Sequence, residues 1–352
     1  MGVWKRSAGK FHHDEADTGL QTTVNHRFYG ISAALDKPFV SGDKDLVIQY
    51  SVKHEQKMDC GGAYIKLLPG GDDFNSARFG GDTPYSVMFG PDICGGKKRT
   101  HVILSSERKD ENVMIDKDIP CETDVISHLY TLVIRPDNTF EVFVDNKSVR
   151  SGDLDAEFDF LEPKEILDPE QSKPADWVDE REIEDPASVK PEGHDDIPAE
   201  IPDPTATKPD DWDDEDDGEW EAPMVDNPEY EGPWRPKMIP NPDYNGPWVH
   251  PKIPNPDYAY DDKMYAVCGK GCTHVGFELW QVKAGSVFDD IIITDSLEEA
   301  QKFAEETFFA KWDGEKAMKE AEEERERKEQ AERATIDLGG DDEDDDEEHD
   351  EF

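Results

Sequence analysis

The chain has 352 residues, with 85 Asp and Glu against 38 Lys and Arg, so its formal net charge at neutral pH is −47. This balance argues against nucleic acid as a partner, because phosphate binding needs clustered Lys and Arg, and it favours divalent cations and basic proteins. The length allows about two domains, and no run approaches the roughly 18 to 20 consecutive apolar residues of a membrane span.

The first 160 residues contain short β-branched and aromatic runs separated by turn residues. A Pro-Asp-Asn turn at 136–138 separates two of these runs. Regular short strands without an intervening helical period indicate a mainly β fold, an antiparallel sandwich. The predicted strands are Leu46–Val52, His101–Leu104, Leu129–Ile134 and Phe140–Val144.

The segment from Pro163 to Pro256 has a different composition, with 19 of the 25 prolines and five of the eight tryptophans. Two repeated units account for it. The unit called A begins three times, at Ile166, Ile183 and Ile201, and the unit called B begins three times, at Gly218, Gly232 and Gly246. The order AAABBB is a strong repeat signal, and repeats that cannot each bury a face must pair with something.

Folding the AAABBB segment at its midpoint pairs the first A with the last B and predicts a hairpin arm with its tip near Asp213 to Gly218. The alternative is a disordered proline-rich linker. Trp and Tyr at fixed repeat positions favour the arm over that alternative. The second A unit has Gly193 and His194 where the other two have Asp-Trp, so we expect a local weak point there.

Strand signals resume after Tyr258, at Val275–Val282 and Ser286–Thr294, and complete the first domain. Ser296 with Glu299 forms a capping box, and apolar residues at helical spacing follow as far as Trp312. The last twelve residues include ten carboxylates and are expected to be disordered. The predicted divisions are 1–162 and 259–313 for the sandwich and the start of the C-terminal helix, 163–258 for the arm, and 314–352 for the charged helix and acidic tail.

Two segments carry a resemblance to a known family: Lys53–Leu68 (KHEQKMDCGGAYIKLL) and Met88–Cys94 (MFGPDIC). They resemble the two signature segments of the calreticulin and calnexin lectin chaperones. The arm and the acidic tail match as well, and three copies of each repeat without a membrane span resemble the calreticulin branch. The resemblance covers essentially the whole chain and implies a concanavalin-like lectin domain in a non-enzymatic chaperone.

The resemblance also implies a carbohydrate site for high-mannose N-glycans capped by one glucose. Aromatic rings cover the apolar face of a sugar, while carboxylate and lysine groups bind its hydroxyls. Without the family, the aromatic residues would be interpreted as core or strand-surface residues, and the lysine as a solvated charge. The implied residues are Tyr64, Lys66, Tyr85, Met88, Asp92, Ile103, Glu278 and Trp280, with Glu278 where many calreticulins carry Asp.

By the same resemblance Cys60 and Cys94 form a disulfide, which requires an oxidising compartment and implies the lumen of the endoplasmic reticulum. Cys121 corresponds to an unpaired thiol. Cys268 and Cys272 depart from the family pattern. A local disulfide is favoured there over a zinc site, which would need two further ligands.

The family's structural calcium site implies Asp289 as a ligand, together with backbone carbonyls of Ala16 and Thr18. One tight Ca²⁺ is expected there, and many weakly bound ions are expected in the acidic tail. A further carbonyl of the family's site comes from a strand that would lie upstream of Met1, so the resemblance implies an N-terminally incomplete chain.

The arm tip in this family docks a thiol-disulfide oxidoreductase, and the chain is expected to act as a monomer on monoglucosylated glycoproteins. An enzyme is disfavoured, because the E-x-D-x-x-E pattern of glycosidases with related sandwiches is absent from residues 1–160 and 259–295. A calcium-storage or surface-signalling protein with vestigial lectin activity is the alternative. The implied docking residues are Glu215, Asp217, Glu219 and Trp220.

Overall fold

The computed structural model of the chain describes residues 1–69, 71, 74–210, 212 and 218–338. The described residues form two compact units, one within residues 1–162 and 257–338 and the other within residues 163–256. The second unit is therefore an insertion in the chain of the first. In the described part, no helix combines the length and the apolar character needed to cross a membrane.

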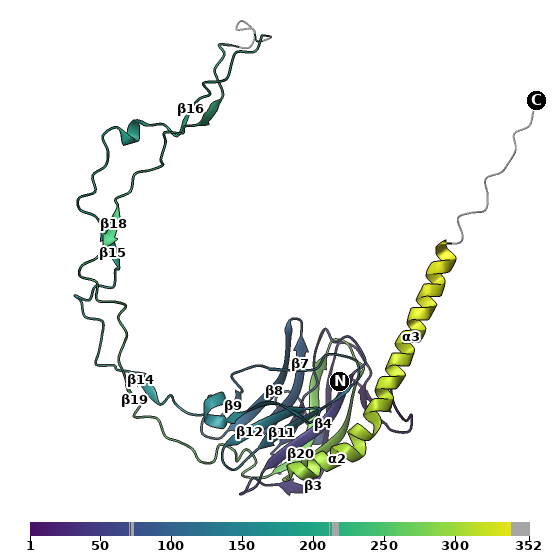
Figure 1. Ribbon diagram of the computed structural model, residues 1–352. Coiled ribbons are helices and arrows are strands. Elements are labelled where there is room, and N and C mark those ends of the chain that lie inside the picture. Colours follow the sequence, from purple (N-terminus) through teal and green to yellow (C-terminus); the bar gives the residue numbers. More distant parts are fainter. Residues whose placement is uncertain (70, 72–73, 211, 213–217, 339–352) are drawn as a thin grey trace, which may run out of the picture. The chain divides into compact units, whose positions relative to one another are not determined.

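The first unit contains a seven-stranded antiparallel sheet (Figure 1). It combines strands from the beginning, middle and end of the unit, in the order β1-β2-β21-β4-β11-β12-β13. Their bounds are Trp4–Ser7 for β1, Gly19–Thr22 for β2, Ser286–Thr294 for β21, Leu46–His54 for β4, Ser127–Ile134 for β11, Thr139–Val144 for β12 and Lys147–Asp153 for β13.

The second sheet has eight strands and carries the order β10-β8-β7-β5-β20-β3, with β6 paired to β20 and β7, and β9 paired to β8. Its pairs are antiparallel throughout. The predicted mainly β, antiparallel fold class is confirmed. The bounds are Ile119–Pro120 for β10, Lys97–Ser106 for β8, Val87–Cys94 for β7, Cys60–Gly62 for β5, Cys272–Gln281 for β20, Arg27–Phe39 for β3, Ile65–Leu68 for β6 and Glu111–Met114 for β9.

The two sheets pack face to face through aromatic side chains. Tyr50 on β4 is fully buried, and its ring lies 6.2 Å from that of Phe89 on β7 and 5.8 Å from that of Phe277 on β20. The Tyr50 hydroxyl donates to the carbonyl of Ala63 over 2.6 Å, so the buried polar group is satisfied. Every residue of β4 is buried, because the strand has protein on both faces.

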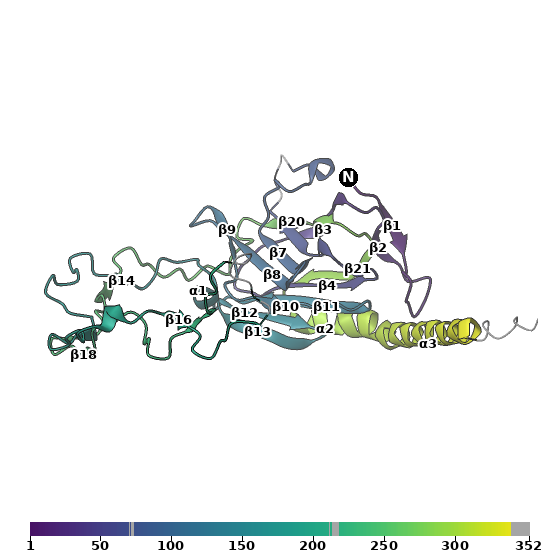
Figure 2. The ribbon, with the colours of Figure 1, turned by 90° about the horizontal axis from the view of Figure 1, so that it is seen from above.

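A C-terminal helical segment begins on the outer face of the seven-stranded sheet: α2 (Leu297–Ala304) packs on the sheet, and α3 (Ala310–Leu338) then runs away from it, as Figure 2 shows. The predicted cap is confirmed, since the Ser296 hydroxyl accepts from the Glu299 amide over 3.2 Å. A π-helical turn, Glu305–Phe309, separates the two helices.

Aromatic side chains hold this helical segment on the sheet. Phe308 packs against Leu129 of β11, and Trp312 Nε1 donates to the Ser127 carbonyl over 2.9 Å. The remaining short helical elements of the described chain are α1 (Leu154–Glu157) and the 3₁₀ turns Ser76–Arg78 and His194–Asp196.

The inserted unit is a long hairpin in which the A units pair with the B units in reverse order. The pairs place Ile166 opposite Ile253, Ile183 opposite Ile239, and Ile201 opposite Val225. This is the order that a chain folded between the two sets of repeats produces. The strands are β14 (Glu165–Leu167) with β19 (Lys252–Pro254), β15 (Glu182–Glu184) with β18 (Met238–Pro240), and β16 (Glu200–Pro202) with β17 (Met224–Asp226).

Side chains repeat the contacts between the two legs of the arm. Trp177 Nε1 donates to the Gly246 carbonyl over 2.8 Å, and Trp212 Nε1 donates to that of Gly218 over 2.9 Å. Both glycines have positive φ, a conformation that other residues rarely adopt. In the second A unit, His194 Nε2 lies 2.9 Å from the carbonyl of Gly232. The contact with a glycine carbonyl is thus kept where the tryptophan is lost, and the local weak point in this unit stays a prediction.

Candidate functional site

Strand register places the residues of the expected carbohydrate site on one face of the eight-stranded sheet. Lys66 on β6 stands opposite Met88 on β7, which in turn stands opposite Ile103 on β8. Lys66 also has Gly276 of β20 as its other neighbour. Since side chains alternate between faces, Asp92, Glu278 and Trp280 lie on the same side, away from the sandwich core. The first residue of the set, Tyr64, directly precedes β6.

A buried ion pair lies at the middle of this face. Lys66 Nζ donates to Glu278 Oε2 over 2.8 Å, and the two side chains are only 2% and 12% exposed. The ammonium also lies over the ring of Tyr85, 4.9 Å from its centroid. A desolvated charge pair of this kind needs further hydrogen bonds, which hydroxyl groups of a ligand can supply.

Asp92 lies beside a histidine that the sequence analysis did not identify. His101 Nε2 is 3.4 Å from Asp92 Oδ2, but it accepts a hydrogen bond from Arg99 Nε over 3.1 Å. Burial lowers the pKa of His101, so the ring is neutral and Nε2 does not donate to Asp92. His101 lies two residues before Ile103 on β8, and strand alternation from Ile103 is the signal that would have identified it.

Tyr64 completes the side of the site next to His101. The two rings stack with centroids 5.9 Å apart at an interplanar angle of 21°. Burial, followed by the charges of Glu278 and Asp92, raises the pKa of Tyr64. Its phenol therefore stays protonated at neutral pH and can both donate and accept a hydrogen bond.

Trp280 has an aromatic neighbour that the sequence analysis also missed. Phe28 of β3 stands directly opposite Trp280, and the ring centroids are 4.7 Å apart. Phe28 is 57% exposed, so the two rings extend the apolar surface to the edge of the sheet. Only the pairing of β3 with β20 reveals this neighbour, because the two residues are 252 positions apart in the chain.

Two hollows border this face. One, of about 600 Å³, is lined by parts of the loop from Pro69 to Pro84, and its Gly81 lies close to Glu278. The other, of about 490 Å³, includes Tyr85 and reaches the loop around Cys268. The site is therefore an open face with flanking grooves, a shape that suits an extended ligand.

Two disulfides stand close to the two ends of the site. Cys60 and Cys94 are bonded and lie opposite each other on β5 and β7, two residues beyond Asp92. Cys268 and Cys272 are also bonded to each other, so the local disulfide is confirmed. Cys121 is free, and burial raises the pKa of its thiol to about 12, which makes it unreactive at neutral pH.

The expected calcium ligand Asp289 lies next to the segment 16–18. Gly19 packs against Asp289, and Asp17 shares a cation with it, because Lys311 Nζ lies 2.6 Å from Asp17 Oδ2 and 3.2 Å from Asp289 Oδ2. The structure therefore places Asp289 beside Gly19 and Asp17, and it adds the ammonium of Lys311.

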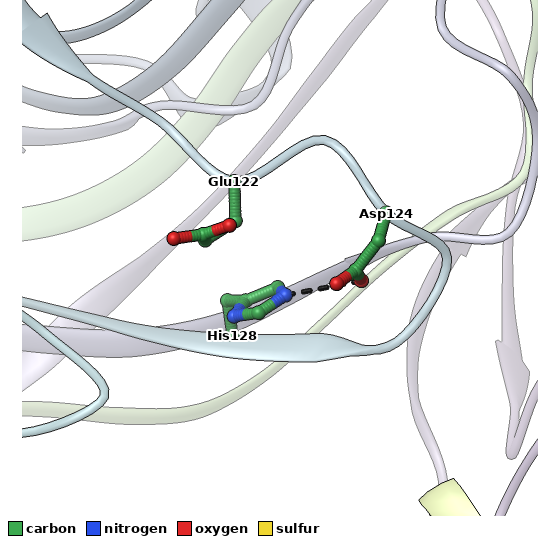
Figure 3. A group of neighbouring side chains, drawn as sticks. All are labelled: Glu122, Asp124 and His128. Carbon is green, nitrogen blue, oxygen red and sulfur yellow. Dashed lines mark hydrogen bonds and ion pairs between the residues drawn. The ribbon is translucent and has the colours of Figure 1, made fainter.

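A second group of possible metal ligands, Glu122, Asp124 and His128, lies on the loop before β11 and on that strand (Figure 3). Both ring nitrogens of His128 are engaged, with Asp145 at 2.8 Å and Asp124 at 3.1 Å. Although burial lowers the pKa of His128, these carboxylates raise it to about 9. His128 therefore forms an ion-pair network with Asp124 and Asp145.

Of the expected docking residues in the arm, Glu219 is exposed and Trp220 is half-buried. Glu215 and Asp217 lie outside the described residues. The structure therefore describes two of the four expected docking residues, and both belong to the first B unit.

Comparisons with known proteins agree with this geometry. The family model described as the Calreticulin family matches residues 1–219 and 215–293. Calreticulin of Chlamydomonas reinhardtii is 58% identical over 319 residues, which cover 90% of this chain and 75% of the relative. Calreticulin of Dictyostelium discoideum is 54% identical over 318 residues, 90% of this chain and 73% of the relative. The solved globular domain of T. cruzi calreticulin superposes with a TM-score of 0.65 at 31% identity, covering 92% of this chain and 91% of that one.

Proposed function

The chain belongs to the calreticulin family of calcium-binding lectin chaperones, and from this premise we propose that it binds high-mannose N-glycans that end in a single glucose. The observation that carries the proposal is the Lys66–Glu278 pair, held at 2.8 Å beneath an open face with aromatic residues around it. A glucose bound there would complete the hydrogen bonding of a charge pair that the protein has already removed from water.

The groups on this face suit the two kinds of surface that a sugar presents, its apolar C–H groups and its hydroxyls. Tyr64, Tyr85 and Trp280 supply apolar area for C–H groups, while the carboxylates of Asp92 and Glu278 accept from hydroxyls. Charge-assisted hydrogen bonds to adjacent hydroxyls distinguish epimers, because a misplaced hydroxyl leaves a buried charge unpaired. Met88 and Ile103 form the apolar floor between them.

Titration calorimetry with a monoglucosylated oligomannose glycan, with and without Ca²⁺, tests this proposal. We expect micromolar affinity, about −8 kcal/mol, and no binding of the unglucosylated glycan. Trp280→Ala and Asp92→Ala should abolish binding while far-UV circular dichroism stays native. Asp118→Asn is the matched control, since this carboxylate is 75% exposed and pairs with Arg99 at the edge of the site. Binding retained in both site variants would show that the face is wrongly assigned.

We also propose that the tip of the arm recruits a thiol-disulfide oxidoreductase through Trp220 and the acids around it. An aromatic residue ringed by carboxylates fits a basic, partly apolar partner surface. Trp220→Ala should lose binding of the oxidoreductase and leave glycan affinity unchanged. Trp234→Ala is the matched control, because it stands at the same position of the next B unit. Equal capture of the oxidoreductase by both variants would contradict the assignment.

The lumen of the endoplasmic reticulum is the compartment we propose. Two disulfides support it, because such bonds persist in oxidising compartments. We further propose calcium storage by residues 314–352, which contain 19 carboxylates and six Lys or Arg. Carboxylates that no fixed turn preorganises into a site of six to eight oxygens bind Ca²⁺ weakly, at roughly 10⁻⁴ to 10⁻³ M. Deleting residues 335–352 should remove most of this capacity in equilibrium dialysis without changing glycan affinity.

The alternative is a calcium-storage or surface-signalling protein in which lectin activity is vestigial. Glu278 is the observation behind it, because its side chain is one methylene longer than the aspartate of many calreticulins. The glycan titration separates the two, since the alternative predicts calcium binding by the tail without glycan binding by the globular unit.

A further inference from the structure

The ammonium of Lys311 lies among three carboxylates, at the place where the resemblance to the family implies a calcium ion. It donates to Asp289 Oδ2 and to Asp290 Oδ1, each over 3.2 Å, and lies 2.6 Å from Asp17 Oδ2. A lysine ammonium has three N–H donors, and here it meets three carboxylates. The cation requirement of the group is met from within the chain.

The position of Lys311 is set by the helix that carries it. The residue follows the π-helical turn Glu305–Phe309, and its flanking residues Phe308 and Trp312 are seated on β11 through packing and through the hydrogen bond to Ser127. These anchors direct the first turn of α3 toward the acidic group. The long lysine side chain then spans the remaining gap between helix and sheet.

The acidic group itself is partly withdrawn from water. Asp290 is only 7% exposed, and its second oxygen, Oδ2, accepts from the Ser51 hydroxyl over 2.8 Å. Asp17 and Asp289 place their carboxylates around the same point as Asp290, each within 3.2 Å of the Lys311 ammonium. A cation is therefore needed at this point, and the lysine supplies it.

With the ammonium in place the residues do not fit a calcium ion. Ca²⁺ requires six to eight oxygens at about 2.3 to 2.6 Å. Asp289 Oδ2 already accepts from Nζ, so a calcium ion on the same oxygen would stand next to a second positive charge. The ion can enter only if Lys311 leaves. An adjoining cavity of about 610 Å³ gives the side chain room to do so, and Asp14 and Glu306 line it.

We propose that Lys311 is a built-in competitor of Ca²⁺ for Asp17, Asp289 and Asp290, which fastens α3 to the sandwich when calcium is low and lowers the affinity of this site for the ion. The proposal concerns the globular unit and does not depend on glycan binding or on the acidic tail.

The test is a Ca²⁺ titration of the full chain by calorimetry and by thermal melting. Lys311→Met keeps the apolar stem and removes the charge, and we expect its tightest Ca²⁺ site to gain at least tenfold in affinity over wild type. Lys302→Met is the matched control: it removes the same charge from the same helical segment, but Lys302 is 76% exposed and pairs only with Glu306 among the described residues. Adding Asp289→Asn to Lys311→Met should abolish the gain. Affinity of Lys311→Met within twofold of wild type would overturn the proposal.

A second measurement uses the wild-type protein and stays decisive if Lys311→Met does not fold. The rate of reductive methylation of Lys311, followed by mass spectrometry, should be low without calcium and should rise at saturating Ca²⁺ as the amine is displaced. The amine of Lys302 should react at the same rate in both conditions. An unchanged rate at Lys311 would show that the ion does not displace it.

Discussion

Lys66 and Glu278 are 212 residues apart in the chain, and in the folded protein their charged groups lie 2.8 Å apart beneath the proposed carbohydrate face. The pairing of β6 with β20 brings them together. Because both side chains are almost fully buried, neither charge has enough water around it to be stable alone. The pair is therefore a structural requirement of the site as well as a binding group.

Glu278→Gln should destabilise the globular unit by about 3 kcal/mol or more, because it leaves the Lys66 ammonium buried without a counter-charge. Glycan affinity should fall with it. Glu278→Asp keeps the charge and should retain binding. Urea denaturation and calorimetry on the two variants measure both effects, and equal stability of Glu278→Gln and Glu278→Asp would contradict the role given to the pair.

The raised pKa of His128 predicts that the globular unit loses stability in mild alkali. Burial lowers its pKa, but Asp124 and Asp145 raise it to about 9, against roughly 6.5 in the unfolded chain. The native state thus binds the proton more tightly than the unfolded state. The stabilisation is complete below pH 6.5 and disappears as the pH rises through about 9, a change of about 3 kcal/mol.

Urea denaturation at pH 6, 7.5 and 9.5 measures this loss. His128→Gln is the control, since its amide cannot take up a proton, and its stability should vary much less over the same range. The same pH dependence in both proteins would assign the effect to other groups.

His194 predicts a local effect in the arm. Its ring replaces the indole of the other two A units as the partner of a glycine carbonyl. His194→Ala removes that hydrogen bond and should speed amide hydrogen exchange around Asp185 and Asn241, the neighbouring contacts of the same repeat pair. The melting temperature of the globular unit should not change. Equal amide exchange rates around Asp185 and Asn241 in the variant and the wild type would refute the local role of His194.

The Cys60–Cys94 disulfide should stabilise the globular unit by about 3 to 4 kcal/mol, the chain-entropy value for a loop of this length. Replacing both cysteines by Ala should lower the urea midpoint accordingly. Glycan affinity should also fall, because the bond joins β5 to β7 beside Asp92. The matched control is Cys268→Ala with Cys272→Ala, which removes a loop of only four residues and should cost less stability.

The sequence by itself determined those features that depend on neighbours in the chain. The run Leu46–Val52 predicted a strand, Ser296 with Glu299 predicted a helix start, and the order AAABBB predicted which repeats would face each other. The resemblance to the family supplied the candidate site residues as a set, with neither distances nor partners.

Only the tertiary structure decided the contacts between distant segments. Strands β5 and β3 contain glycine, and their places in the sheet follow from pairing and not from propensity. The stacking of His101 on Tyr64 and the reach of Lys311 to Asp289 were likewise open in the sequence. The physical reason is that burial and Coulomb interactions depend on distance in space, which local patterns do not contain.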